Sequence, residues 1–174
     1  KIAPELCQAD NKVLNAKRLP HLKHVIKIDD QAHTGMHRFQ DLLTAPTTHM
    51  LKKLDQIASE LQFDETINIQ FTSGTTGNPK GTMLTHNNIL NNGYFVGEAI
   101  HLSLQDRVCI SVPLFHCFGV VMGNLACITH GSTMVYPSAV FNPLDTLKAI
   151  QQEKCTAAYG VPTMFIAILE HEQF

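Results

Sequence analysis

Residues 72–81 combine the side chains and the backbone freedom that a phosphate-binding loop needs. The segment Thr72-Ser-Gly-Thr-Thr-Gly-Asn-Pro-Lys-Gly81 contains four hydroxyl groups, three glycines and one lysine. Glycines let several backbone N–H groups point into one concavity, and hydroxyls add neutral donors around it. Lys80 brings a positive charge that can follow a leaving pyrophosphate. A solvated surface turn is the alternative, but this density of donors favours phosphate binding.

The loop differs from two common nucleotide-binding motifs. A Walker loop ends in Gly-Lys followed by Ser or Thr, whereas this segment ends in Pro79-Lys80-Gly81. The dinucleotide pattern Gly-x-Gly-x-x-Gly is also absent. A conventional phosphate-hydrolysing NTPase is therefore not favoured. Pro79 is expected to restrict the backbone beside the lysine.

The elements that must position this loop alternate between strand and helix patterns. Period-two alternation predicts a strand at 67–71 before the loop, and Thr85 is predicted to cap the helix after it, with Gly93 and Gly97 fraying that helix. Further strands are predicted at 108–112, 132–136 and 156–159. Further helices are predicted at 116–129, ended by Gly131 in a left-handed conformation, at 142–153, capped by Asn142, and at 162–171. This order predicts an α/β fold, in which helices flank a mainly parallel sheet.

The first 65 residues have a different composition from the rest. They hold 18 of the 28 charged side chains and one of the ten glycines. Helices are predicted at 4–16 and 48–61, with a short strand at 24–29. We therefore expect residues 1–65 to form a solvated periphery and residues 66–174 to form an α/β core that contains the phosphate-binding loop; the resemblance described below implies that this core binds a nucleotide.

Length, composition and charge exclude several classes of protein. The chain of 174 residues is 44% hydrophobic, which allows a substantial core, and its net charge of −2 gives no basic footprint for nucleic acid. No apolar run approaches the ~18 residues of a membrane span. We therefore expect a protein that binds small molecules, without nucleic acid and without a transmembrane segment.

The cysteines and histidines give no metal signature. The five cysteines are odd in number and contain no Cys-x-x-Cys, so neither a disulfide framework nor a zinc site is predicted. His33 and His37 have helical spacing but flank Gly35, and His-Glu-x-x-His does not occur. A reducing compartment is the simplest interpretation: the cytoplasm, with the mitochondrial matrix as the alternative.

Three motifs together resemble the adenylate-forming (AMP-binding) superfamily. The segment from Phe71 to Gly81, followed by Leu84-Thr-His86, resembles its phosphate-loop signature. Pro113-Leu-Phe-His-Cys-Phe-Gly119 resembles the next motif, and Tyr159-Gly-Val-Pro-Thr-Met-Phe165 resembles the strand and turn that follow. With Asn87-Asn-Ile-Leu-Asn-Asn92, the sequence is most similar to the acyl-CoA synthetases that act on medium-chain fatty acids.

The resemblance implies a two-step reaction with ATP, Mg²⁺ and CoA. A carboxylate attacks the α-phosphate to give acyl-AMP and pyrophosphate, and the sulfur of CoA then displaces AMP. Lys80 would stabilise the leaving pyrophosphate, and His116 would lie beside the substrate carboxylate. The residues that would bind the nucleotide are Thr72, Ser73, Gly74, Thr75, Thr76, Gly77, Asn78, Pro79 and Lys80.

Each of these residues also has an alternative, purely structural role. His116 could instead be a capping or partly buried histidine, and Tyr159 and Gly160 could form a wall of the substrate crevice or an ordinary strand end. Phe118, Met122 and Met164 are favoured as core residues over an acyl-tunnel lining.

The resemblance also implies that much of the enzyme lies outside these residues. Family members are several hundred residues long and carry downstream adenine, magnesium, ribose and hinge segments that do not occur here, so most Mg²⁺ ligands are expected elsewhere. We expect part of a large N-terminal domain, inactive alone, whose exposed faces could support a homodimer. An aryl- or amino-acid-adenylating enzyme and a non-catalytic nucleotide-binding module are the alternatives.

Overall fold

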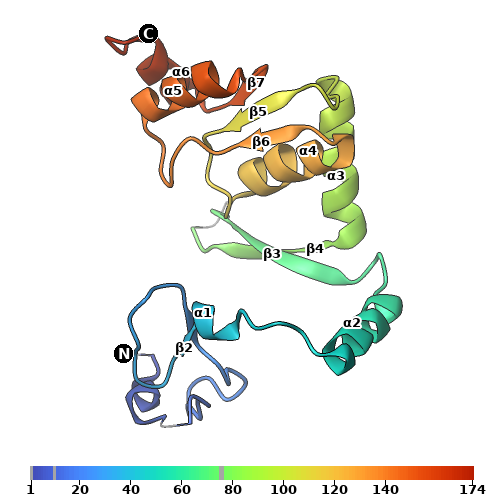
Figure 1. Cartoon of the computed structure of the whole chain (residues 1–174), viewed down its shortest axis with the longest axis vertical. Coiled ribbons are helices and arrows are strands. Elements are labelled where there is room, and N and C mark those ends of the chain that lie inside the picture. Colours follow the sequence, from blue (N-terminus) through green and yellow to red (C-terminus); the bar gives the residue numbers. More distant parts are fainter. Residues whose placement is uncertain (1, 10, 75–76) are drawn as a thin grey trace. The chain divides into compact units, whose positions relative to one another are not determined.

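The computed structural model describes residues 2–9, 11–74 and 77–174. The chain divides into two compact units, Lys1–Glu60 and Leu61–Phe174 (Figure 1). The assignment of residues 1–65 to a periphery and of residues 66–174 to a nucleotide-binding core stays a prediction. No helix in the described ranges is long and apolar enough to cross a membrane.

The first unit contains little regular structure before its last helix. Its elements are η1 (Pro4–Gln8), β1 (Ile26–Lys27), β2 (His37–Arg38), α1 (Phe39–Leu42) and α2 (Thr48–Glu60). The helix predicted at 4–16 is wrong beyond residue 8, because Lys12 adopts a left-handed conformation with φ of 59° and the side chain of Asn11 accepts a hydrogen bond from the Val13 amide. The strand predicted at 24–29 is confirmed only at 26–27, where β1 pairs with β2 in parallel. Helix α2 matches its prediction.

The second unit is built around a short parallel sheet with β5 in its centre. Strands β5 (Arg107–Ile110), β6 (Thr133–Val135) and β7 (Ala157–Tyr159) pair in the order β6-β5-β7. Its helices are α3 (His86–Ala99), η2 (Phe118–Leu125), α4 (Ala126–His130), α5 (Pro143–Glu153) and α6 (Pro162–Leu169). The structure thus confirms the α/β class and the parallel pairing of the last three predicted strands.

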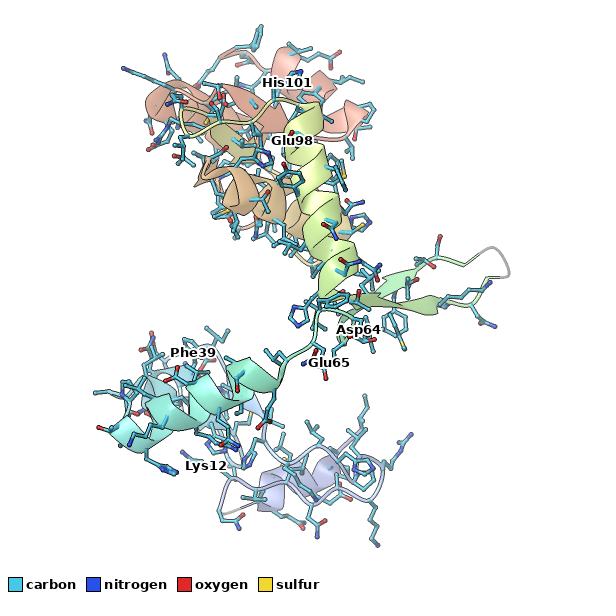
Figure 2. All side chains as sticks on the ribbon, turned by 90° about the vertical axis from the view of Figure 1, so that its right-hand side faces the viewer. Lys12, Phe39, Asp64, Glu65, Glu98 and His101 are labelled. Carbon is cyan, nitrogen blue, oxygen red and sulfur yellow. The ribbon has the colours of Figure 1, made fainter. Side chains whose placement is uncertain are left out.

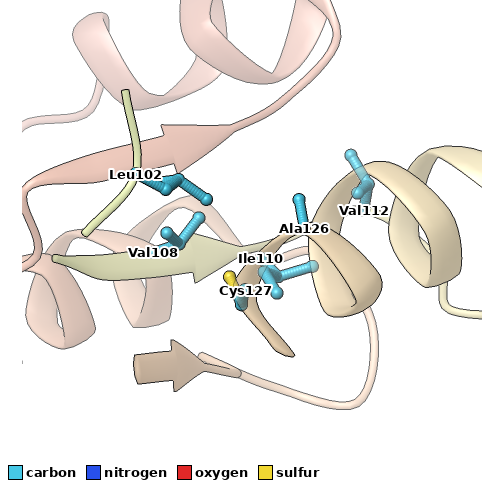
Figure 3. Close-up of a cluster of buried hydrophobic side chains, with 6 residues drawn as sticks. All are labelled: Leu102, Val108, Ile110, Val112, Ala126 and Cys127. Atoms are coloured by element: carbon cyan, nitrogen blue, oxygen red, sulfur yellow. The ribbon is translucent and has the colours of Figure 1, made fainter. Parts of the chain in front are cut away.

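The core of this unit forms where β5 meets η2 and α4. Val108 and Ile110 of β5 are 0% and 3% exposed and pack with Ala126 and Cys127 (Figure 3). Burying a side chain of the size of Val or Ile stabilises a fold by about 1.5–3 kcal/mol. This cluster fixes the carboxyl end of β5, from which the chain enters the turn that carries His116.

Local signals placed the helix ends correctly. Thr85 caps α3 by accepting a hydrogen bond from the Asn88 amide at 3.1 Å, and Asn142 caps α5 through the Asp145 amide at 3.0 Å. Gly131 ends α4 in the left-handed conformation with φ of 68°. The predicted helix 116–129 is found as the π-helical η2 followed by α4.

Two glycines of α3 were misinterpreted from the sequence. Gly93 and Gly97 do not fray the helix; both are buried within a continuous α3, which packs along η2 and α4. A Cβ on Gly93 would lie 2.6 Å from the Cβ of Leu125, and one on Gly97 would overlap the ring of His130. The glycines therefore allow close helix packing, which outweighs their poor helix propensity. At the end of α3, Glu98 pairs with His130, and His101 has a left-handed backbone (Figure 2).

The loop predicted to join a strand to a helix instead joins two antiparallel strands. Strand β3 (Thr66–Thr72) pairs with β4 (Lys80–Thr85), which the sequence analysis missed. The base of this hairpin is tied by the His86 amide, which donates to the Glu65 carbonyl at 3.3 Å, and by the Asn87 amide, which donates to the Phe63 carbonyl at 2.8 Å. Asp64 and Glu65 precede β3 at this base (Figure 2). Among the described residues of the second unit, the four predicted strands thus become five, in two separate sheets.

Candidate functional site

The register of the hairpin sets the two ends of the predicted phosphate loop. Thr72, the last residue of β3, pairs with Lys80, the first residue of β4, and Phe71 pairs with Gly81. Of the intervening residues, 73–74 and 77–79 are described, and they lie at the turn end of the hairpin. Lys80 is exposed and is the only charged side chain between residues 66 and 85. An anion at this end of the hairpin meets one cation and no local carboxylate.

The backbone of the loop needs its glycines. Gly74 and Gly77 have φ angles of 63° and 86°, a region that residues with a side chain rarely adopt. A Cβ on Gly74 would overlap the carbonyl oxygen of Asn78, so the two sides of the loop approach each other closely. Ser73, Asn78 and Pro79 are exposed beside this crossing. Thr75 and Thr76, predicted to bind phosphate, lie outside the described residues.

A cavity of about 660 Å³ opens between the hairpin, α3 and η2. Its lining contains no charged residue, and its polar groups are amides and hydroxyls. Pockets of 300–1,000 Å³ with apolar walls and few polar groups are typical of small-molecule sites. The lining residues are Gln70, Thr72, Thr82, Met83, Leu84, Asn88, Ile89, Asn92, Cys117, Val121 and Met122. We call this the hairpin cavity.

The hairpin cavity links two motifs that are distant in the sequence. Thr72, at the base of the loop, and Cys117, next to His116, lie on its walls. The sequence analysis did not identify Gln70, Asn88 and Asn92 as site residues. Gln70 lies on the same face of β3 as Thr72, and this alternation was a signal that could have identified it. Met122, favoured as a core residue, lines this cavity instead.

His116 lies in the turn between β5 and η2 and is exposed. The amide of Phe118, the first residue of η2, donates a hydrogen bond to Nδ1 of His116 at 3.0 Å. Its neighbour Phe115 lines a second cavity of about 780 Å³ at the carboxyl ends of β5 and β6. His116 is therefore flanked in the sequence by Phe115, which lines the second cavity, and by Cys117, which lines the hairpin cavity.

Tyr159 and Gly160 lie at the carboxyl end of β7. The Tyr159 ring packs edge-on against Phe118, with 5.5 Å between ring centres. Its buried hydroxyl has no hydrogen-bond partner in the part of the chain that the structure describes. Burial raises the pKa of Tyr159, and the negative charge of a Cys127 thiolate would raise it further. Tyr159 is thus brought to the His116 turn rather than to the hairpin.

The remaining predicted candidates divide between core and cavity. Phe118 and Met164 pack against the buried cluster of β5, as favoured from the sequence, and Met164 also lines the second cavity. A Cβ on Gly160 would lie 3.2 Å from the Phe165 ring, which limits that position to a small residue.

The donor set of the loop fits a polyphosphate better than it fits a metal ion. Mg²⁺ in proteins is held by carboxylates together with phosphate oxygens and water, and residues 66–85 contain no carboxylate. The described residues contain no group of three His, Cys, Asp or Glu side chains that could hold a metal. The hairpin end therefore offers hydroxyls, amides and one ammonium group to phosphate oxygens.

The chain is similar to a known protein family and to curated proteins. A family model described as AMP-binding enzyme matches residues 3–174. The chain is 55% identical over 148 residues to acyl-CoA ligase sidI of Aspergillus fumigatus, covering 85% of the chain and 25% of that protein. It is 40% identical over 181 residues to the mitochondrial medium-chain acyl-CoA ligase ACSF2 of Homo sapiens, covering 100% of the chain and 29% of that protein.

A solved structure shares the fold. ATP-bound MatB from Rhodopseudomonas palustris superimposes with a TM-score of 0.57 at 27% identity, over 66% of this chain and 22% of that one. The chain spans less than a third of the length of the curated relatives described above.

Proposed function

The chain belongs to the AMP-binding enzyme family, and on this basis we propose that it forms the phosphate-binding and acyl-binding part of an ATP-dependent fatty acid–CoA ligase. The proposed enzyme adenylates a carboxylate, releases pyrophosphate and passes the acyl group to CoA. The observation that carries the proposal is the hairpin cavity: an uncharged, mainly apolar space that begins at Thr72, at the base of a loop whose only charge is Lys80.

The loop is assigned to the β- and γ-phosphates of ATP. The left-handed glycines turn the backbone tightly, and Ser73 and Lys80 are exposed at the turn end of the hairpin. A flexible ammonium group can remain with the pyrophosphate as charge accumulates on it, which lowers the barrier to its departure. Mg²⁺, held by phosphate oxygens and mostly by residues outside this chain, would supply further charge neutralisation when bound.

The hairpin cavity is assigned to the hydrocarbon chain of the substrate. Met83, Leu84 and Ile89 on one side and Val121 and Met122 on the other provide apolar contact. A charged amino-acid side chain would find no counter-ion there, so the lining supports a fatty acid over a charged amino acid. The printed names of the two curated relatives, both acyl-CoA ligases, support the same class of substrate.

A pyrophosphate-exchange assay tests the assignment. Octanoate-dependent exchange of labelled pyrophosphate into ATP is measured on the polypeptide encoded by the full open reading frame that contains this chain. Lys80→Ala is expected to lower exchange by about 10²-fold, the usual effect of removing one group that stabilises transition-state charge. Lys52→Ala, on the exposed surface of α2, is the matched control and is expected to leave exchange unchanged.

Each contrary result has a distinct meaning. Unchanged exchange in Lys80→Ala would contradict the role of the lysine. Exchange with aryl or amino acids but not with octanoate would favour another adenylating enzyme. Nucleotide binding without any exchange would favour a non-catalytic module.

Two further features remain proposals. The five cysteines are free thiols, which supports a reducing compartment, either the cytoplasm or the mitochondrial matrix. Exposed apolar residues on the hairpin that do not line its cavity, Ile69 and Phe71, support contacts with further protein, of which a homodimer is one form.

A further inference from the structure

Two histidines of the first unit lie with ring nitrogens facing each other. Nδ1 of His24 and Nε2 of His37 are 3.1 Å apart, and the centres of the two rings are 5.1 Å apart. Nε2 of His37 also lies 3.2 Å from the carbonyl oxygen of Lys12. A second imidazole nitrogen and a carbonyl oxygen are thus both close to one nitrogen of His37.

Backbone pairing brings these groups together from distant positions in the sequence. His37 is the first residue of β2, and its amide donates to the carbonyl of Val25, the neighbour of His24, at 2.8 Å. The Leu14 amide donates to the Lys23 carbonyl at 2.7 Å, so the turn that precedes Leu14 is also held beside this segment. The two histidines are 13 residues apart, which is why no local spacing in the sequence indicates the pair.

The separations fit a shared proton and also a shared metal ion. Without a metal, Nε2 of His37 donates its proton, because the Lys12 carbonyl can only accept, and Nδ1 of His24 accepts as well. With a metal, two bonds of about 2.05 Å that meet at the tetrahedral angle of about 109° place the ligand atoms about 3.3 Å apart. The observed separations of 3.1 and 3.2 Å are close to this value.

The pair borders a small cavity. The cavity has a volume of about 290 Å³ and is lined by His24, Ile26, His37 and Leu42. A water molecule occupies about 30 Å³ in the liquid, so the space accommodates an ion with several waters. His24 is exposed, which gives an ion a path from solvent to the ring nitrogens.

The donor set is uncharged, and this determines the class of ion. Asp41 accepts a hydrogen bond from Nε of Arg38 at 3.1 Å and lies 3.9 Å from the Lys12 ammonium, so its carboxylate already has two cationic partners. Mg²⁺ and Ca²⁺ are bound chiefly through carboxylate and other oxygens, whereas imidazole suits Zn²⁺, Cu²⁺ and Ni²⁺. The pair therefore fits a divalent transition-metal ion.

We propose that His24 and His37, together with the carbonyl oxygen of Lys12, bind one divalent transition-metal ion, with water completing its coordination. The ion takes the lone pairs of Nδ1 of His24 and Nε2 of His37. The proton on Nε2 of His37 passes through solvent to Nδ1 of the same ring, so both imidazoles stay neutral. The site lies in the first unit and does not depend on the ligase assignment, which concerns residues of the second unit.

Calorimetric titration of the 174-residue chain with Zn²⁺ tests the site. His24→Asn and His37→Asn are each expected to weaken the binding of one Zn²⁺ by at least ten-fold, since losing even an outer-shell partner of a metal ligand costs about 10- to 100-fold. His21→Asn is the matched control, because His21 is an exposed histidine of the same segment, and it is expected to leave binding unchanged. Mg²⁺ is expected not to bind at this pair.

X-ray absorption at the zinc edge gives a readout that needs no variant. The unaltered chain with one equivalent of Zn²⁺ should show two imidazole nitrogens at about 2.0–2.1 Å. Fewer than two imidazole ligands, or no binding of Zn²⁺ at all, would overturn the proposal. Binding that survives either His24→Asn or His37→Asn, or that falls equally in His21→Asn, would also overturn it. Circular dichroism confirms that each variant keeps the fold of the unaltered chain.

Discussion

Replacing Gly119 by alanine is expected to disrupt the turn that holds His116. The new Cβ would lie 2.8 Å from the Pro113 carbonyl carbon and 3.1 Å from the Cα of Leu114. These neighbours are backbone atoms, so no side-chain rotation relieves the overlap and the turn itself must move. Inserting a methyl group into such a packed position costs about 1–3 kcal/mol.

Gly123→Ala provides the matched control within the same helix. Gly123 is buried in η2 like Gly119, but a Cβ there would meet the side chain of Ile110 at 3.1 to 3.5 Å, and that side chain can shift by a few tenths of an ångström. Both substitutions gain about 1 kcal/mol of helix propensity, which cancels in the comparison. Gly119→Ala is therefore expected to be less stable than Gly123→Ala by about 1–3 kcal/mol.

Urea unfolding of the 174-residue chain, followed by circular dichroism, measures this difference. The Gly119→Ala midpoint should fall below that of Gly123→Ala with an unchanged slope. Hydrogen exchange at the Phe118 amide gives a local readout, because that amide is protected only while it donates to His116. Equal stabilities, or greater stability of Gly119→Ala, would refute the packing argument.

Two further predictions concern stability elsewhere in the second unit. Gly97→Ala is expected to push α4 away from α3, because its Cβ would overlap the His130 ring. The overlap costs about 1–3 kcal/mol and the gain in helix propensity offsets about 1 kcal/mol of it, so urea unfolding should show a net loss of up to about 2 kcal/mol, and a gain in stability would contradict the packing argument. Hydrogen bonds from the Ser103 hydroxyl, the Thr156 hydroxyl and the Ser103 amide, in order of decreasing effect, lower the pKa of Asp106 below its usual value. The stabilisation from the ionised carboxylate is therefore present above about pH 4 and is lost as the pH falls through the lowered pKa. Unfolding midpoints measured against pH should thus show that the difference between Asp106→Asn and the unaltered chain shrinks below pH 4, and a constant difference would contradict this role.

The sequence predicted those features that depend on a few neighbouring residues. Thr85 and Asn142 cap helices because a hydroxyl or amide oxygen reaches an amide three residues later, and Gly131 ends α4 because only glycine adopts φ of 68° without strain. The apolar runs of β5 to β7, which alternate with helix patterns along the chain, predicted a buried parallel sheet. These signals depend on residues close together in the sequence, so they can be identified without knowledge of tertiary contacts.

The features that were missed depend on distant partners. Gly93 and Gly97 lower helix propensity, but Leu125 and His130 pack onto them and keep α3 continuous. Strand β4 begins at Lys80 and contains no clear alternation, since its extended state comes from pairing with β3. The hairpin cavity likewise joins β3, α3 and η2, and no spacing within one segment reveals it.

The missed strand changes how the loop can attract phosphate. A loop that leads directly into a helix uses the positive end of the helix dipole, which acts within about one turn. Here the six residues of β4, at about 3.3 Å each, put roughly 20 Å between Lys80 and the start of α3 at His86. The dipole of α3 therefore contributes little at the loop. Attraction must come from the loop amides, its hydroxyls and the one ammonium group between residues 66 and 85, which is why the loss of Lys80 should be so costly.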